Sequence, residues 1–119
     1  VRRWNVRFAA EKYRNGLVGC AVRLLCSADG VAWSEAGEPA AFPADADTAG
    51  YAVEACPGAN LNVERRVAFG LPVTPGGVFY LAWQVSVTAG EVTADAQALG
   101  IDDVQVAPVV SGLSALTVR

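Results

Sequence analysis

The sequence contains no histidine, which removes the commonest general base of enzymes and the Ser–His–Asp triad. Its serines lie in no nucleophile-elbow pattern, and no pair of carboxylates has the spacing of a glycosidase acid/base pair. No glycine-rich loop has the spacing that holds phosphate. We therefore expect a protein that is not an enzyme.

Charge and long apolar runs are also scarce. Only 18% of residues are charged and the net charge is −3, whereas nucleic-acid binding needs a broad basic surface. No apolar run approaches the ~18 residues that span a bilayer, and no basic-then-apolar leader opens the chain, so any export signal is expected upstream. We expect neither nucleic-acid binding nor membrane insertion.

The three cysteines are Cys20, Cys26 and Cys56. Zinc is not expected, because there is no CxxC pair and no histidine. Cys20 and Cys26 fall in one predicted strand, which would separate them by roughly 20 Å, far beyond the ~7 Å limit for a disulfide. At most one of them pairs with Cys56, and buried free thiols are the alternative.

What the chain does have is apolar material, 53% of 119 residues, enough for the packed core of one domain. Period-two alternation, typical of half-buried strands, places Trp4, Val6, Phe8 and Ala10 on one face. Glycine and proline separate the segments, and no amphipathic helix of ten residues is visible. The prediction is an all-β sandwich or barrel with strands over residues 3–10, 17–27, 31–34, 66–71, 78–87 and 99–106.

The segment 35–62 is rich in alanine, glycine, proline and aspartate. We expect an irregular loop there, with one short strand near residues 51–54. Loops of this length in compact domains are often functional.

Several motifs resemble those of secreted bacterial β-sandwich domains. The segment 26–33 (CSADGVAW) resembles an S-x-D-G-x-x-W hairpin, and 79–83 (FYLAW) resembles an L-R-W strand, with Ala82 in place of the usual arginine. The segment 100–104 (GIDDV) is similar to the I-D-D-V closing strand of MAM-like and carbohydrate-binding jelly rolls. Residues 11–16 (EKYRNG) resemble the W-R-N-G segment that precedes the second strand.

The resemblance is to jelly-roll domains of large exported proteins in Bacteroidetes and Verrucomicrobia. It implies an antiparallel jelly-roll sandwich over residues 1–119, located extracellularly or at the cell surface as one segment of a larger protein, with 108–119 a terminal strand or linker. Such folds have about eight strands, and six or seven are visible. We therefore expect a first strand upstream of Val1, whose absence would leave an edge open to pairing.

Asp102 and Asp103 are adjacent, so one should point inward unless a bulge intervenes, and a buried carboxylate needs a partner or a metal. The resemblance implies that either aspartate could hold a structural calcium ion. The alternatives are an ion pair with an inward arginine, or backbone N–H groups donating to the carboxylate.

A sugar-binding face needs exposed aromatic rings beside polar groups. Trp4 and Trp83 are predicted in the core, so the ligand-binding candidates are Tyr80 and Gln84 with Arg7 on a concave sheet, and Trp33 after the hairpin turn.

Two functions therefore remain open. One is a non-catalytic accessory module that interacts with other domains of the parent protein, and the alternative is a carbohydrate-binding module that recognises surface glycans. The oligomeric state is left open.

Overall fold

The computed structural model describes residues 1–44, 60–88 and 96–109. These residues form strands without a helix, so the predicted all-β class is confirmed, and no described segment is a helix suited to crossing a membrane. The strands are β1 (Arg3–Arg14), β2 (Cys20–Ser27), β3 (Ser34–Glu35), β4 (Ala40–Phe42), β5 (Leu61–Ala68), β6 (Tyr80–Val87) and β7 (Ala98–Pro108).

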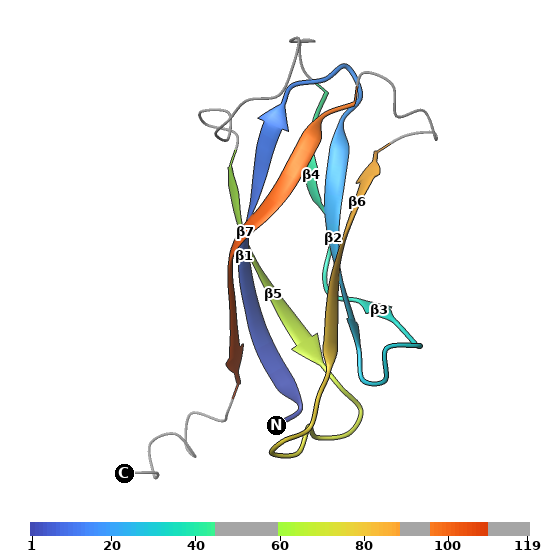
Figure 1. Cartoon of the computed structure of the whole chain (residues 1–119), viewed down its shortest axis with the longest axis vertical. Coiled ribbons are helices and arrows are strands. Elements are labelled where there is room, and N and C mark those ends of the chain that lie inside the picture. Colours follow the sequence, from blue (N-terminus) through green and yellow to red (C-terminus); the bar gives the residue numbers. More distant parts are fainter. Residues whose placement is uncertain (45–59, 89–95, 110–119) are drawn as a thin grey trace.

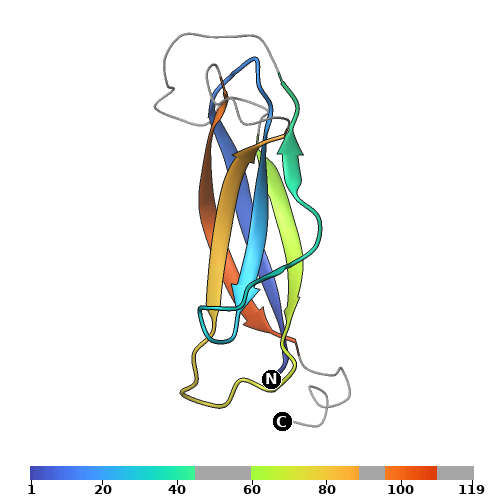
Figure 2. The ribbon, with the colours of Figure 1, turned by 90° about the vertical axis from the view of Figure 1, so that its right-hand side faces the viewer.

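The strands build two facing antiparallel sheets, which confirms the sandwich (Figures 1 and 2). In one sheet β1 lies between β5 and β7. In the other, β6 pairs with β2 along all of Cys20–Ser27, so β3 and β4 pair with β2 from its other side, β3 at its end and β4 at its beginning. Strands β6 and β7 are thus the edge strands on one side of the sandwich (Figure 2).

The core fills the space between the sheets. Val6, Val22 and Val67 are the largest fully buried side chains and come from β1, β2 and β5. Alternate residues of a strand point to opposite faces, and the shared face predicted for Val6, Phe8 and Ala10 is confirmed by their place in the core cluster. Val22, Leu24 and Cys26 of β2 belong to the same cluster.

Trp4 and Trp83 pack against this cluster, as predicted. The Trp83 ring meets Phe8 edge to face, with 5.8 Å between ring centroids, and Trp4 stacks at a tilt on Phe79 at 4.9 Å. The indole N–H groups of both tryptophans are buried without a hydrogen-bond partner among the described residues. Both tryptophans therefore contribute to the core through their rings alone.

Gln97 joins three segments at one end of the sandwich. Its side-chain oxygen accepts from the Cys20 amide at 3.0 Å, and its side-chain nitrogen donates to the Pro43 carbonyl at 2.8 Å. Gln97 is only 7% exposed, and a buried amide satisfied at both ends is structurally specific. The start of β2, the end of β4 and the start of β7 are held together by this one side chain.

The two described cysteines, Cys20 and Cys26, are buried and free. Burial raises the pKa of each thiol, because the thiolate loses its hydration in the core. Cys56, their predicted alternative partner, lies outside the described residues.

The region after β2 differs from the prediction in detail. The return strand is β3, not residues 31–34, because the Asp29 carboxylate accepts the amides of Val31 and Ala32 at 2.8 and 2.9 Å and holds this segment as a turn. Strand β4 falls within the segment predicted to be irregular. The short strand expected at 51–54 lies outside the described residues.

Leu24 and Leu25, neighbours in β2, test which face of this strand points into the core. Leu24 is 2% exposed in the core, whereas Leu25 is half-buried on the outer face. Leu24→Ala should lower the free energy of unfolding by about 2–5 kcal/mol, and Leu25→Ala by clearly less, in chemical denaturation. Equal losses would contradict the assignment of β2 faces.

Candidate functional site

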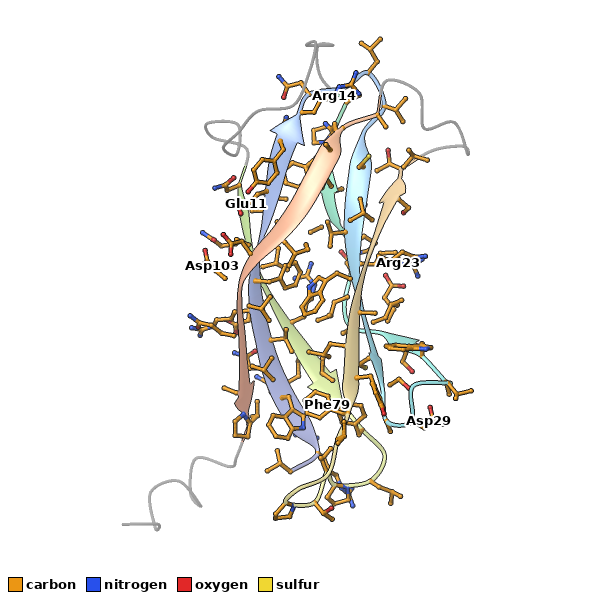
Figure 3. The ribbon with its side chains drawn as sticks, in the orientation of Figure 1. Glu11, Arg14, Arg23, Asp29, Phe79 and Asp103 are labelled. Atoms are coloured by element: carbon orange, nitrogen blue, oxygen red, sulfur yellow. The ribbon has the colours of Figure 1, made fainter. Side chains whose placement is uncertain are left out.

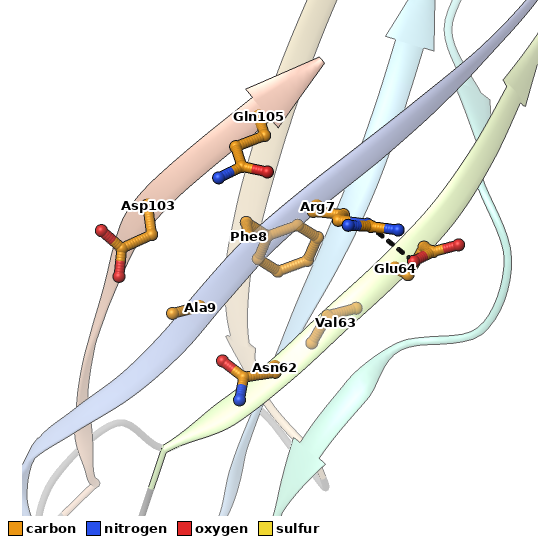
Figure 4. A pocket seen from close by; sticks show the side chains of 8 residues that line it. All are labelled: Arg7, Phe8, Ala9, Asn62, Val63, Glu64, Asp103 and Gln105. Atoms are coloured by element: carbon orange, nitrogen blue, oxygen red, sulfur yellow. Dashed lines mark hydrogen bonds and ion pairs between the residues drawn. The ribbon is translucent and has the colours of Figure 1, made fainter. Parts of the chain in front are cut away.

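The outer face of the β5–β1–β7 sheet carries the candidate site. Val6, Phe8 and Ala10 point into the core, so the intervening residues of β1 point away from it. Here a hollow of about 290 Å³ opens over the middle of the sheet (Figure 4). We call it the β1 hollow, and its lining residues are Arg7, Phe8, Ala9, Asn62, Val63, Glu64, Asp103 and Gln105.

A small residue makes room for the hollow. Ala9 lies opposite Asn62 of β5 on one side and Asp102 of β7 on the other. Cross-strand neighbours share a face, so longer polar side chains surround a methyl group that is only 6% exposed. A larger side chain at Ala9 would fill the hollow without entering the core.

A bulge in β7 determines where the two aspartates point. The pairing with β1 shifts between Arg7↔Gln105 and Ala9↔Asp102, which inserts one extra residue into β7. Asp103 has a positive φ of 53°, a conformation that aspartate tolerates better than most residues. Both aspartates are exposed, and the Asp102 carboxylate accepts the Asp103 amide at 2.8 Å. The bulge thus removes the expected inward carboxylate, and Asp102 accepts a backbone N–H group at the surface instead.

The charges in the hollow are largely paired. The Arg7 Nε atom donates to the Glu64 carboxylate at 2.8 Å (Figure 4). A side-chain hydrogen bond from Asn5, followed by the bond and charge of Arg7, holds the pKa of Glu64 below its usual value. Both side chains of the pair are more than half exposed, so its stabilising effect is small. Its effect here is to fix the direction of the guanidinium and the carboxylate.

The hollow is equipped for hydrogen bonding. Its amides, carboxylates and guanidinium both donate and accept hydrogen bonds. Its lining includes no serine, threonine, cysteine, lysine or tyrosine that could act as a nucleophile. The arrangement can hold a polar group in place through hydrogen bonds.

The structure separates the predicted ligand-binding residues. Tyr80 and Gln84 belong to β6 and lie on the outer face of the other sheet, where Gln84 accepts from Arg23 at 3.4 Å. Figure 3 shows Arg23 on the side of the molecule away from Asp103. Arg7 is not brought together with them, because β1 and β6 belong to different sheets. Trp33 is 42% exposed and precedes β3.

Tyr80 packs over the turn that follows β2. The Tyr80 ring covers Gly30 closely. A Cβ atom added to Gly30 would lie 3.5 Å from the nearest ring carbon, which is an ordinary van der Waals distance. Gly30 has a positive φ of 79°, which glycine adopts without strain. Tyr80 therefore covers a turn, while Arg7 and Asp103 meet in the β1 hollow.

Asn62, Glu64 and Gln105 were not predicted as site residues. The strand containing the first two was expected to begin at residue 66, whereas β5 begins at Leu61. Polar residues at 62, 64 and 66 alternate with Val63 and Val67 in the sequence, and an earlier strand start would have given them an outward face.

No family model matches the chain. No curated protein and no solved structure matches it at a significant level either.

The pKa of Glu64 can be checked directly by NMR titration of its side-chain carboxyl group. Asn5→Ala and Arg7→Ala should each raise this pKa towards the usual value of about 4.3. Because the folded-state pKa is lowered, the stability contributed by Glu64 is present above its unfolded-state pKa and is lost as the pH falls through the folded-state value. A pKa unchanged in both variants would contradict the described hydrogen bonds.

Proposed function

We propose that this domain is a non-catalytic accessory module of a secreted or cell-surface protein and that it acts by binding through the β1 hollow. The observation that carries the proposal is the hollow itself, where hydrogen-bonding groups of three strands surround the small side chain of Ala9. The exported location is supported by the motifs at 26–33, 79–83 and 100–104. The structural or protein-interaction role is supported by the pairing of Arg7 with Glu64, since a charge that is already paired costs less to bury at an interface than an unpaired one.

A second candidate is carbohydrate binding. It is favoured by the combination of amides, carboxylates and a guanidinium in one hollow, because sugar hydroxyls both donate and accept hydrogen bonds. Tyr13 supplies an aromatic ring farther along β1, four residues beyond Ala9, where it packs against Gly100 of β7. On this reading the ligand is a glycan bound by β1, β5 and β7, and Tyr80 and Gln84 are not in the same site.

A matched pair of substitutions tests the site. Ala9→Leu fills the hollow, and Ala41→Leu adds the same atoms to an exposed position of β4 in the other sheet. We expect chemical-shift changes at Asn62, Glu64 and Gln105 when a ligand is added, at least a tenfold loss of affinity in Ala9→Leu, and unchanged affinity in Ala41→Leu.

The ligands to add are a panel of soluble oligosaccharides and, separately, the segments of the parent polypeptide that flank this domain. Shifts with a flanking segment support the interaction role, and shifts with an oligosaccharide support the glycan alternative. If both ligands shift only residues outside the hollow, or if Ala9→Leu binds as the wild type does, the proposal fails.

A structural calcium ion at Asp102 and Asp103 stays a prediction. Calcium takes six to eight oxygen ligands, and among residues 1–44, 60–88 and 96–109 no cluster of three or more histidine, cysteine, aspartate or glutamate side chains forms. The two carboxylates would thus supply only part of a calcium site. Thermal melts with calcium and with a chelator decide the matter: a calcium-dependent rise in Tm that Asp103→Asn abolishes supports the ion, and an unchanged Tm excludes it.

A further inference from the structure

The strands that end the two sheets are protected to very different degrees. Edge strands of soluble proteins are usually short, bulged, or interrupted by charged residues or proline, because a regular edge pairs with other chains. Strands β3 and β4 have only two and three residues, and β5 carries consecutive charged residues at positions 64–66. Strand β7 has the bulge, two exposed aspartates and a terminal proline. Each of these edges is thus unsuited to pairing.

Strand β6 has none of these protections. Its eight residues include no charged residue, no proline and no glycine. Its pairing with β2 runs from Tyr80 to Val87 without a register shift, and within the described residues β6 pairs only with β2. The other edge of β6, which lies along one side of the sandwich in Figures 1 and 2, is therefore long, regular and uncharged.

Two hydrogen bonds identify the backbone groups on this free edge. The Thr88 amide donates to the Gly19 carbonyl at 2.9 Å, so Thr88 directs its backbone groups towards β2. Successive residues of an antiparallel strand direct these groups alternately to one side and to the other. Leu24, which lies opposite Trp83, agrees with this alternation, because its carbonyl accepts from the Ala36 amide on the far side of β2. The N–H and C=O groups on the free edge of β6 therefore belong to Leu81, Trp83, Val85 and Val87.

The same residues of β6 face the core. Trp83 packs against the core cluster, and Val85 lies opposite Val22, which is 1% exposed. Val85 itself is 45% exposed, and Val104 and Val106 of β7, on the same side of the sandwich, are 47% and 42% exposed. A strand added to the free edge of β6 must therefore present apolar side chains at alternate positions in order to continue the core.

We propose that β6 pairs with β6 of a second copy of this chain, antiparallel across a two-fold axis, so that the two sheets join into one. Strand β6 meets the requirement of its own edge, because it has apolar residues at alternate positions and no charge that a second copy would repel. A two-fold axis perpendicular to the sheet keeps each residue on its face, so core-facing residues of the two copies exchange backbone hydrogen bonds. Such a contact is closed and gives a dimer, not a filament. The proposal does not depend on the β1 hollow, which lies on the other sheet.

The register that we propose places the axis at Gln84. Gln84 then lies opposite Gln84 of the second copy, and its side-chain amide can both donate and accept. Trp83 lies opposite Val85 of the second copy, and aromatic and β-branched side chains form a favourable cross-strand pair. The exposed Val85 is covered in this way by an indole ring. An axis at Trp83 would instead place two indole rings directly opposite each other.

Sedimentation velocity of the whole chain over a range of concentrations, combined with hydrogen exchange, tests the proposal. We expect the wild type to form dimers. The Val85 amide, on the free edge of β6, should exchange slowly in the dimer and fast in the monomer. The Ser86 amide, which is directed to β2, should stay protected in both and reports that the domain is folded.

Gln84→Lys should weaken the dimer at least about tenfold, because it places two lysines opposite each other across the axis. Gln84 is exposed, so the substitution leaves the core unchanged. The matched control, Ala107→Lys, adds the same charge to an exposed position of the edge strand β7 and should leave dimerisation unchanged. An equimolar mixture of Gln84→Lys and Gln84→Glu should associate more tightly than either variant alone, since a lysine then faces a glutamate.

A wild type that stays monomeric at its highest soluble concentration overturns the proposal and leaves the edge to a strand of another protein. A dimer with a fast-exchanging Val85 amide also overturns it, and so does equal weakening by Gln84→Lys and Ala107→Lys. Slow exchange of the Val85 amide in the monomer would mean that the edge is covered within one chain, which contradicts the proposal as well. A mixture that associates no more tightly than its components overturns the register at Gln84. None of these results bears on the Ala9→Leu experiment.

Discussion

The structure depends on one constraint, that each sheet must bury one face against the other. In a strand this reserves every second residue for the core, and the row Val6, Phe8 and Ala10 shows how fully β1 meets the requirement. Side chains that can bind a ligand are then confined to the outer faces, the edge strands and the turns. The β1 hollow lies on an outer face, and the exposed valines of the edge strands β6 and β7 lie where the constraint is met only partly.

The period-two pattern predicted the fold well wherever burial is one-sided. The strands around Phe8 and Trp83 were placed with the correct faces because apolar and polar residues alternate there. Strand β4 was missed, since three residues beside proline are too short to show a period. Strand β5 was predicted to begin too late, because three charged residues in a row hide its alternation. The jelly-roll connectivity stays a prediction.

The candidate site was much harder to predict than the fold. Arg7 and Asp103 were both singled out, but for different roles, and only the pairing of β1 with β7 brings them together. Pairing between strands nearly a hundred residues apart is not encoded in local periodicity. The bulge at Asp103 was equally hidden, because an extra residue in one strand is visible only against its partner. Tyr80 looked like a surface ligand group in the sequence, and its packing over Gly30 depends on the turn that follows β2.

The two buried thiols link folding to oxidation chemistry. Cys20 and Cys26 are shielded in the folded domain, and burial keeps them protonated, whereas the thiolate is the form that attacks disulfides. The folded domain is therefore inert in an oxidising medium as far as these two residues are concerned. An unfolded chain exposes both of them and can be trapped as mixed disulfides. In an oxidising medium, a chain that forms its core before oxidation keeps these two thiols in the reduced form of the folded domain.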